Sequence, residues 1–221
     1  MRRLADWEPY LRKHSGLPGP RANLELLAAV VEEGDARRFR RLAASNDEYL
    51  AACGAAGLGR IAIRSRASSM RTLHRLASDP RWRVREGVAI GLQRFGKEEM
   101  HDLLNAMREW SQDGPYVQRA AVAALCEPAL LARREDVVAV LDVLDDITRS
   151  LASTTDRRGD GFRVLRQALG YGWSVAAAAA PREAKPYFER WMRSTDKDVQ
   201  WIIRSNLGKA RIATLATELA R

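Results

Sequence analysis

The chain has few of the residues that build metal centres and disulfides. Among its 221 residues, two are cysteine and three are histidine. Cys53 and Cys126 lie far apart, each among alanines and leucines, and the histidines at 14, 74 and 101 do not pair at ligand spacing. We therefore expect no metal and no cofactor, and we expect two small buried thiols in a reducing compartment.

Long apolar runs and alternating strand patterns are also missing. The longest apolar run, residues 175–181, is mostly alanine and is far shorter than a bilayer requires. Residues 1–8 lack the apolar segment of a signal peptide. We expect a cytoplasmic protein without a membrane segment, and we expect helices, because alanine and leucine dominate the apolar set.

Lysine is scarce in a chain that is nevertheless basic. Five lysines stand against 32 arginines, the formal net charge is +9 and the sequence pI is about 10.1. Residues 1–113 carry about +5 and the remainder about +4. A basic balance favours anionic partners, with nucleic acid first. An excess of arginine over lysine also arises in GC-rich coding sequences, so the charge alone leaves the partner open.

The chain does contain a repeating pattern. A polar turn with Asp or Ser is followed by Val, by Arg or Gln, and by Leu eight residues after the Val; these pairs are Val84 and Leu92, Val117 and Leu125, and Val199 and Leu207. An earlier copy has Leu50 and Leu58. A period of about 33 to 37 residues on helical sequence is typical of stacked helical hairpins. The pattern predicts an all-α, right-handed α-solenoid of about five HEAT-like hairpins, folded as a monomer.

The hairpins set the expected organisation of one domain, residues 1–221. Residues 1–34 form an N-terminal cap, with an amphipathic piece at Leu4–Lys13 and a helix at 23–33; residues 35–207 hold five hairpins, and 208–221 form a C-terminal cap helix. The expected hairpin helices are 36–44 and 48–58, 68–77 and 81–95, 98–111 and 115–125, 135–153 and 160–179, and 182–193 and 196–207. Residues 154–160 are polar, charged and contain glycine, so we expect a mobile loop there.

Each turn carries an aspartate: Asp79, Asp113 and Asp196. A carboxylate at this place caps the following helix by accepting backbone N–H groups. In HEAT-like repeats the turn Asp and the Arg after Val also form a ladder between neighbouring hairpins. Asp79 and Arg85 match that pattern, whereas Gln118 and Gln200 replace the arginine in the other two copies.

Several glycines lie inside expected helices, where each costs up to about 1 kcal/mol. Gly54, Gly57 and Gly59 follow no strand, so close helix packing explains them better than a phosphate-binding loop. The segment from Gly170 to Trp173 requires a close approach by a neighbouring helix or by a ligand, and the first is favoured. Tyr171 and Trp173 are expected in the core.

The segment Leu165-Arg166-Gln167-Ala168-Leu169-Gly170-Tyr171 resembles a helix of the HEAT-like bacterial alkylpurine-DNA glycosylases. The resemblance implies a two-layer solenoid whose concave face cradles duplex DNA, with tryptophans and an aspartate around the damaged nucleotide. The nearest candidates for that pair are Trp110 and Asp113. The family's Trp and trailing Leu-Arg are replaced here by Tyr171 and Gly172-Trp173-Ser174.

In stacked hairpins the second helices line the concave face, where exposed side chains meet a ligand. Arginine forks suit phosphate, and a tryptophan can stack on a sugar or base. The candidate binding residues are Arg85, Arg119, Arg163, Arg166, Trp201, Arg204 and Lys209, with Arg83 and Arg211 nearby. We expect a non-catalytic scaffold that binds a macromolecule, possible partners being duplex nucleic acid and an acidic protein. A glycosylase for alkylated bases and a protein-assembly factor remain the alternatives.

Overall fold

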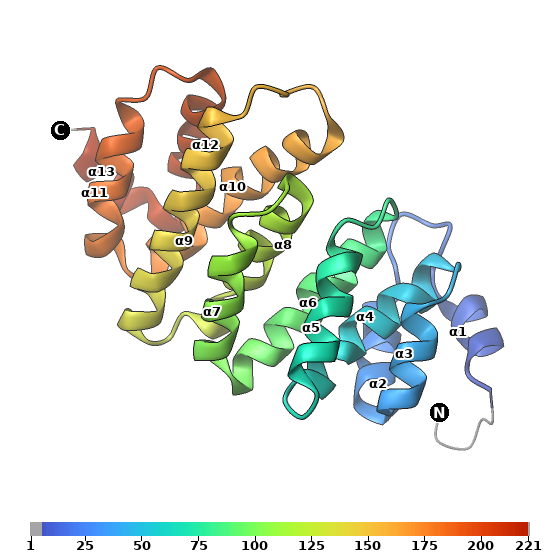
Figure 1. The fold of residues 1–221 in the computed structure, drawn as a ribbon. Coiled ribbons are helices and arrows are strands. Elements are labelled where there is room, and N and C mark those ends of the chain that lie inside the picture. The colour runs from blue at the N-terminus through green and yellow to red at the C-terminus, as the bar shows by residue number, and fades with distance from the viewer. Residues whose placement is uncertain (1–5, 221) are drawn as a thin grey trace. The chain divides into compact units, whose positions relative to one another are not determined.

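The computed structural model describes residues 6–220, and these residues form helices and no strand (Figure 1). The fold class is all-α, of the α-solenoid type, as the repeat predicts. Backbone packing divides the chain into two compact units, residues 1–99 (unit 1) and 100–221 (unit 2). Leu4 and Ala5, at the start of the expected lead-in helix, lie outside the described residues.

Unit 1 contains two capping helices followed by two hairpins. Its helices are α1 (Glu8–His14), α2 (Leu24–Glu33), α3 (Ala36–Ala43), α4 (Glu48–Ala62), α5 (Arg66–Ala77) and α6 (Trp82–Glu98). α4 is the centre of the unit: it packs against α3, α5, α6 and α2, and most of its side chains are buried.

Unit 2 contains three hairpins and a terminal helix. Its elements are α7 (Met100–Trp110), α8 (Pro115–Leu125), the short 3-10 helix η1 (Pro128–Leu130), α9 (Arg134–Ser153), α10 (Asp160–Ala179), α11 (Pro181–Met192), α12 (Lys197–Leu207), the short 3-10 helix η2 (Ala210–Ile212) and α13 (Ala213–Leu219). α8, α10 and α12 pack side by side as one layer, and α7, α9 and α11 form the other. The second helices of the hairpins therefore share one layer of unit 2.

The Val-to-Leu spacing places most of the expected side chains in the core. Leu50, Leu92 and Leu125 are fully buried, and so are the valines at 84 and 199. Leu207 is the exception, because it is only half-buried. The following helix, α13, packs mainly against α11, so the last turn of α12 has less cover than its counterparts. The Val-to-Leu pattern predicts Leu207 as a core residue equivalent to Leu92 and Leu125, and that prediction is wrong.

The glycines confirm the expected close helix packing. A Cβ on Gly91 of α6 would lie 2.7 Å from the carbonyl oxygen of Ala55 in α4. Gly59 faces the backbone of Gly91 in return, and Gly54 faces the backbone of Ala43 in α3. Glycine and alanine thus let the backbones of α4 and its neighbours touch, which no larger side chain would permit.

The connections between helices differ in how their ends are capped. Asp196 caps α12 by accepting from the N–H groups of Asp198 and Val199, as expected. Asp79 instead accepts from the N–H of Arg81, and Gly114 rather than Asp113 occupies the N-cap position of α8. Asp79 and Asp113 therefore lack the predicted N-cap position, because Arg81 and Gly114 directly precede α6 and α8.

The described residues contain no helix that combines the length and apolarity needed to cross a bilayer.

Candidate nucleic-acid interface

The solvent side of α10 carries a stripe of polar and aromatic side chains. Arg163, Gln167 and Tyr171 follow one another at four-residue spacing and are all exposed. Residues four apart lie on one helix face, so the three form a continuous line along α10. The opposite side of the helix, with Leu169 and Trp173, is buried. Trp173 is a core residue as predicted, whereas the prediction for Tyr171 is wrong, because its ring is 48 % exposed.

Basic residues from neighbouring elements lie beside this stripe. The guanidinium of Arg211 lies 4.6 Å from the ring centre of Tyr171 and donates a 3.1 Å hydrogen bond to its hydroxyl. Arg204 is exposed on α12, and Arg119 is half-buried on α8; both helices pack against α10. We call this set the α10 face: Arg119, Arg163, Gln167, Tyr171, Arg204 and Arg211. Lys209, half-buried, lies between α12 and η2.

Two of the predicted binding residues hold the layer together. Trp201 is half-buried, and a Cβ on Gly170 would lie 2.7 Å from its ring. The guanidinium of Arg166 lies over the same ring, 3.8 Å from its centre. The indole is therefore enclosed between α10 and an arginine, which explains Gly170 by packing. Gly172 has the same explanation, since it faces Val122 and Cys126 of unit 2.

The loop expected to be mobile, residues 154–160, is tied to the start of α12. Arg157 pairs with Asp196 at 2.6 Å and with Asp198 at 3.0 Å, and it donates to the carbonyls of Thr154 and Ala152. Asp198 also pairs with Arg166 at 2.8 Å. The hydrogen bond from Arg157 lowers the pKa of Asp196, and the guanidinium pKa rises in return. This is the expected ladder between hairpins, although Arg157 and not the residue after Val provides the cation.

The residue after Val has a different function, which is to close its own turn. Arg85 donates to the carbonyl of Pro80 at 2.9 Å, Gln118 to that of Ser111 at 2.8 Å, and Gln200 to that of Ser194 at 3.0 Å. Arginine and glutamine serve equally here, because only a long side chain with an N–H donor is needed. Arg85 therefore has a structural role, and Arg81, which pairs with Asp79 at 2.7 Å, reaches the carbonyl of Ser45 in the preceding turn.

Trp110 and Asp113, the candidate pair for base excision, lie in different environments. Trp110 is 5 % exposed, at the end of the first helix of its hairpin. Asp113 is exposed in the turn that follows. The buried indole is thus part of the core and offers no stacking face to a nucleotide.

Unit 2 does contain a buried carboxylate beside tryptophan, but in the other layer. Asp145 of α9 is 4 % exposed and accepts a 2.8 Å hydrogen bond from Trp191 Nε1. Arg149 and Arg190 also bind its two oxygens. Its hydrogen-bonding capacity is used within the protein, so it joins α9 to α11 and has little left for a substrate.

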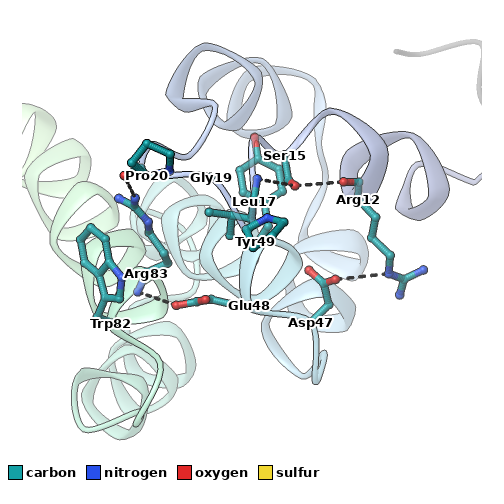
Figure 2. A pocket seen from close by; sticks show the side chains of 11 residues that line it. Arg12, Ser15, Leu17, Gly19, Pro20, Asp47, Glu48, Tyr49, Trp82 and Arg83 are labelled. Atoms are coloured by element: carbon teal, nitrogen blue, oxygen red, sulfur yellow. Dashed lines mark hydrogen bonds and ion pairs between the residues drawn. The ribbon is translucent and has the colours of Figure 1, made fainter.

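Unit 1 contains a cavity of about 490 Å³ next to the segment Ser15–Pro20 (Figure 2). Its polar groups bind one another. Glu48 accepts from the N–H of Arg83 at 3.0 Å, and Arg83 donates to the carbonyl of Pro20 at 2.8 Å while covering the ring of Trp82. Arg12 pairs weakly with Asp47 at 3.5 Å. Charges of both signs are balanced here, and the cavity selects no single class of ligand.

The thiols of Cys53 and Cys126 are free and buried, as predicted. Burial raises the pKa of each to about 12. Residues 6–220 contain no group of three histidine, cysteine, aspartate or glutamate side chains placed to hold a metal ion.

The geometry defines a helical-repeat protein of the α-solenoid class. Residues 36–126, less than half of the chain, match the family model of HEAT repeats, so this segment is HEAT-like. A crystal structure of an engineered protein is similar at 18 % identity over 96 % of this chain and 94 % of the other, with a TM-score of 0.41, which is too low to support any functional argument. Among curated proteins, no significant match was found.

Proposed function

We propose that the protein is a non-catalytic HEAT-like scaffold that binds nucleic acid through the α10 face. The observation that carries the proposal is the line of Arg163, Gln167 and Tyr171, with Arg204 and Arg211 on the adjoining elements. Arginine neutralises phosphate, and an exposed tyrosine packs against a sugar or an unpaired base. No helix within residues 6–220 carries a compact set of base-reading side chains, so the binding would follow backbone and shape rather than sequence.

The ion pair that Arg163 makes does not block this face. Arg163 pairs with Asp160 at 2.8 Å, and both side chains are about two-thirds exposed. Exposed pairs of this kind contribute about 0–1 kcal/mol, so a phosphate can displace Asp160 at little cost. Arg204 has no ion pair among the described residues.

An acidic protein partner is less well supported. The exposed large apolar side chains of the described residues are scattered over separate elements, at Tyr10, Leu24, Ile63, Trp82, Tyr171 and Met192. A protein interface usually has a contiguous apolar or aromatic centre. The alkylpurine-glycosylase alternative gains no support either, because Trp110 is buried and Asp113 lies apart in a turn.

A duplex-binding titration across salt concentrations tests the proposal. We expect the combined change of Arg119, Arg163 and Arg204 to Gln to reduce the slope of log affinity against log salt by about 2 to 3, since each neutralised phosphate contributes about 0.9. Tyr171→Phe should leave the slope alone, and Tyr171→Ala should weaken binding without changing the slope. The matched control replaces Arg158, Arg182 and Arg193, which are also exposed. If the control lowered the affinity and the slope equally, the loss would come from net charge alone and not from the α10 face.

The glycosylase alternative has its own test. We expect no release of methylated purine from alkylated DNA above the uncatalysed rate. Release that is lost in Asp113→Asn would overturn the non-catalytic assignment.

A further inference from the structure

The positive charge of this chain is concentrated in one stretch. Residues 36–78 contain nine arginines, no lysine and two acidic residues, a formal charge of +7 out of the chain's +9. The two halves of the sequence have similar net charges, which hides this concentration. The reason is that residues 1–35, which precede the stretch, carry six acidic side chains. The stretch comprises α3, α4 and α5 of unit 1.

Five of these arginines are exposed and have no side-chain partner among the described residues. Arg37 and Arg40 lie on α3, Arg64 in the turn before α5, and Arg71 and Arg75 on α5. We call these five residues the outer arginine face. The other four arginines of the stretch have partners: Arg60 binds the carbonyls at the end of α2, Arg41 pairs with Asp6 and Glu8, Arg38 covers the ring of Trp7, and Arg66 also makes an interaction.

The helices that carry or follow these side chains, α3 and α5, are the first helices of their hairpins. α3 and α5 both pack against α4, and each is joined to it by a loop of a few residues. Both therefore run antiparallel to α4 and parallel to each other, so their starts, with Arg37 and Arg64, lie at the same end. The buried sides of α3 and α5 carry Phe39, Leu42, Leu73 and Leu76, which turns the arginines toward solvent.

The first helices of the unit 2 hairpins carry arginines of both kinds, since Arg182 and Arg193 are exposed without an ion pair among the described residues whereas others pair with acidic side chains. There Arg149 and Arg190 pair with Asp145, and Arg134 pairs with Glu183. Unpaired like charges on neighbouring helices destabilise a fold, so their retention on α3 and α5 points to an external anion.

We infer that the outer arginine face of unit 1 binds the phosphate backbone of duplex nucleic acid. Arginine is always charged and its planar fork matches phosphate oxygens. Arg71 and Arg75 are four residues apart, about 6 Å along the helix axis, against about 3.4 Å of duplex axis for each phosphate of one strand. Such a pair can reach alternate phosphates of a strand.

The rest of this surface supports a backbone contact rather than another class of partner. A hollow of about 520 Å³ at α3 is lined by Asp35, Arg37, Arg38 and Arg41, three of them cationic. Ile63 is the one large exposed apolar side chain described between residues 36 and 78. A membrane-binding surface would need an apolar face to insert, and a protein-binding surface would need an aromatic or apolar centre.

The experiment compares two variants of the full-length protein that lose the same charge. The first changes Arg37, Arg40, Arg64, Arg71 and Arg75 to Gln; the control changes five other exposed basic residues, Arg21, Lys97, Arg158, Arg182 and Arg193, to Gln. Fluorescence anisotropy of a short labelled duplex of arbitrary sequence is recorded across salt concentrations. We expect the first variant to lower the slope of log affinity against log salt by about 2 to 4 and to weaken binding about tenfold or more, and the control to change the slope by less than about 1.

The outcomes separate this inference from the proposed function, on which it does not rest. If duplex binding fails only when the α10 face is changed, and the first variant matches the control, the inference is wrong. Binding to phosphatidylserine vesicles or to an acidic polypeptide, without binding to duplex, would overturn it in favour of those partners. Circular dichroism of both variants checks that each remains folded, as expected for substitutions on the surface.

Discussion

At the residue scale, side chains with the same chemistry have different roles according to what lies beside them. Arg166 covers Trp201, Arg157 joins two turns, and Arg204 faces solvent without a partner. The sequence predicts Arg166 and Arg204 as binding residues and places Arg157 in a mobile loop. It does not separate their roles, because the distinction depends on contacts between residues about 40 positions apart.

The two thiols give a first test at this scale. Because burial raises the pKa of Cys53 and Cys126 to about 12, each is a protonated thiol at pH 8 as well as an inaccessible one. We expect both to react with a thiol reagent only on the timescale of unfolding, measured by the release of chromophore from a disulfide dye. Unfolded protein in denaturant provides the control and should react at once. Rapid labelling of the native protein would contradict the buried placement.

Asp196 provides a pH-dependent test. Its folded pKa is lowered by Arg157, so its contribution to stability is present above the unfolded value of about 3.9 and is lost as pH falls through the folded value. Asp196→Asn keeps a capping oxygen and loses the charge, and should cost about 1 kcal/mol at pH 7. Asp196→Ala loses the cap as well and should cost about 2 kcal/mol.

Denaturant unfolding of the three proteins from pH 2 to pH 7 measures these costs. The wild type and Asp196→Asn should converge as pH falls through the lowered folded pKa of Asp196, because the carboxyl group is then protonated. A constant difference between them over the whole range would show that the charge contributes nothing.

At the element scale, the repeating pattern predicts helices well and their ends less well. The second helices α8, α10 and α12 begin within a residue of the expected positions, because Pro115, Asp160 and the Asp196 cap mark them. The face that each helix exposes is harder to predict. Tyr171 looks like a core aromatic in sequence, yet it continues the exposed line of Arg163 and Gln167, a four-residue spacing that could have identified it.

The contact of α4 with α6 predicts an unusual response to a small substitution. Alanine favours a helix over glycine by up to about 1 kcal/mol. In Gly91→Ala, however, the new methyl group would lie 2.7 Å from the Ala55 carbonyl oxygen, and backbone cannot move aside cheaply. We expect a net loss of about 1–2 kcal/mol in urea unfolding. Gly208→Ala is the control, since its nearest atom is at 3.6 Å, and it should be close to neutral.

The Val-to-Leu pattern gives a graded prediction. Leu92→Ala and Leu125→Ala should each cost about 2–5 kcal/mol, because both side chains are fully buried. Leu207→Ala should cost less, about 1 kcal/mol, because the residue is half-buried at the end of α12. Equal losses in all three proteins, measured by chemical denaturation, would mean that the end of α12 is packed like its counterparts.

At the scale of the whole molecule, the fold class follows from the period, whereas the division into two units does not. The repeating pattern is the same in both units, but the contacts between their helices differ. In unit 1, α4 and α6 make backbone contacts through glycine. In unit 2, polar groups join the helices; Asn206, for example, is fully buried and binds the backbone of both Leu169 and Ser174. Charge is also uneven: unpaired arginines gather on α3 and α5, whereas Arg149 and Arg190 of unit 2 share the buried Asp145. The net charges of the two sequence halves are similar, so they do not reveal these differences.

Because repeat proteins are stabilised by contacts between neighbours, the two compact units should respond separately to damage. Leu50 in α4 and Leu169 in α10 are both fully buried, so each change to Ala should cost about 2–5 kcal/mol where it occurs. Native-state hydrogen exchange should show faster opening in unit 1 for Leu50→Ala and in unit 2 for Leu169→Ala, by about 30-fold or more, with the other unit nearly unchanged. If either substitution accelerates exchange equally throughout residues 6–220, the chain unfolds as one cooperative body, and the separation seen in its packing has no energetic counterpart.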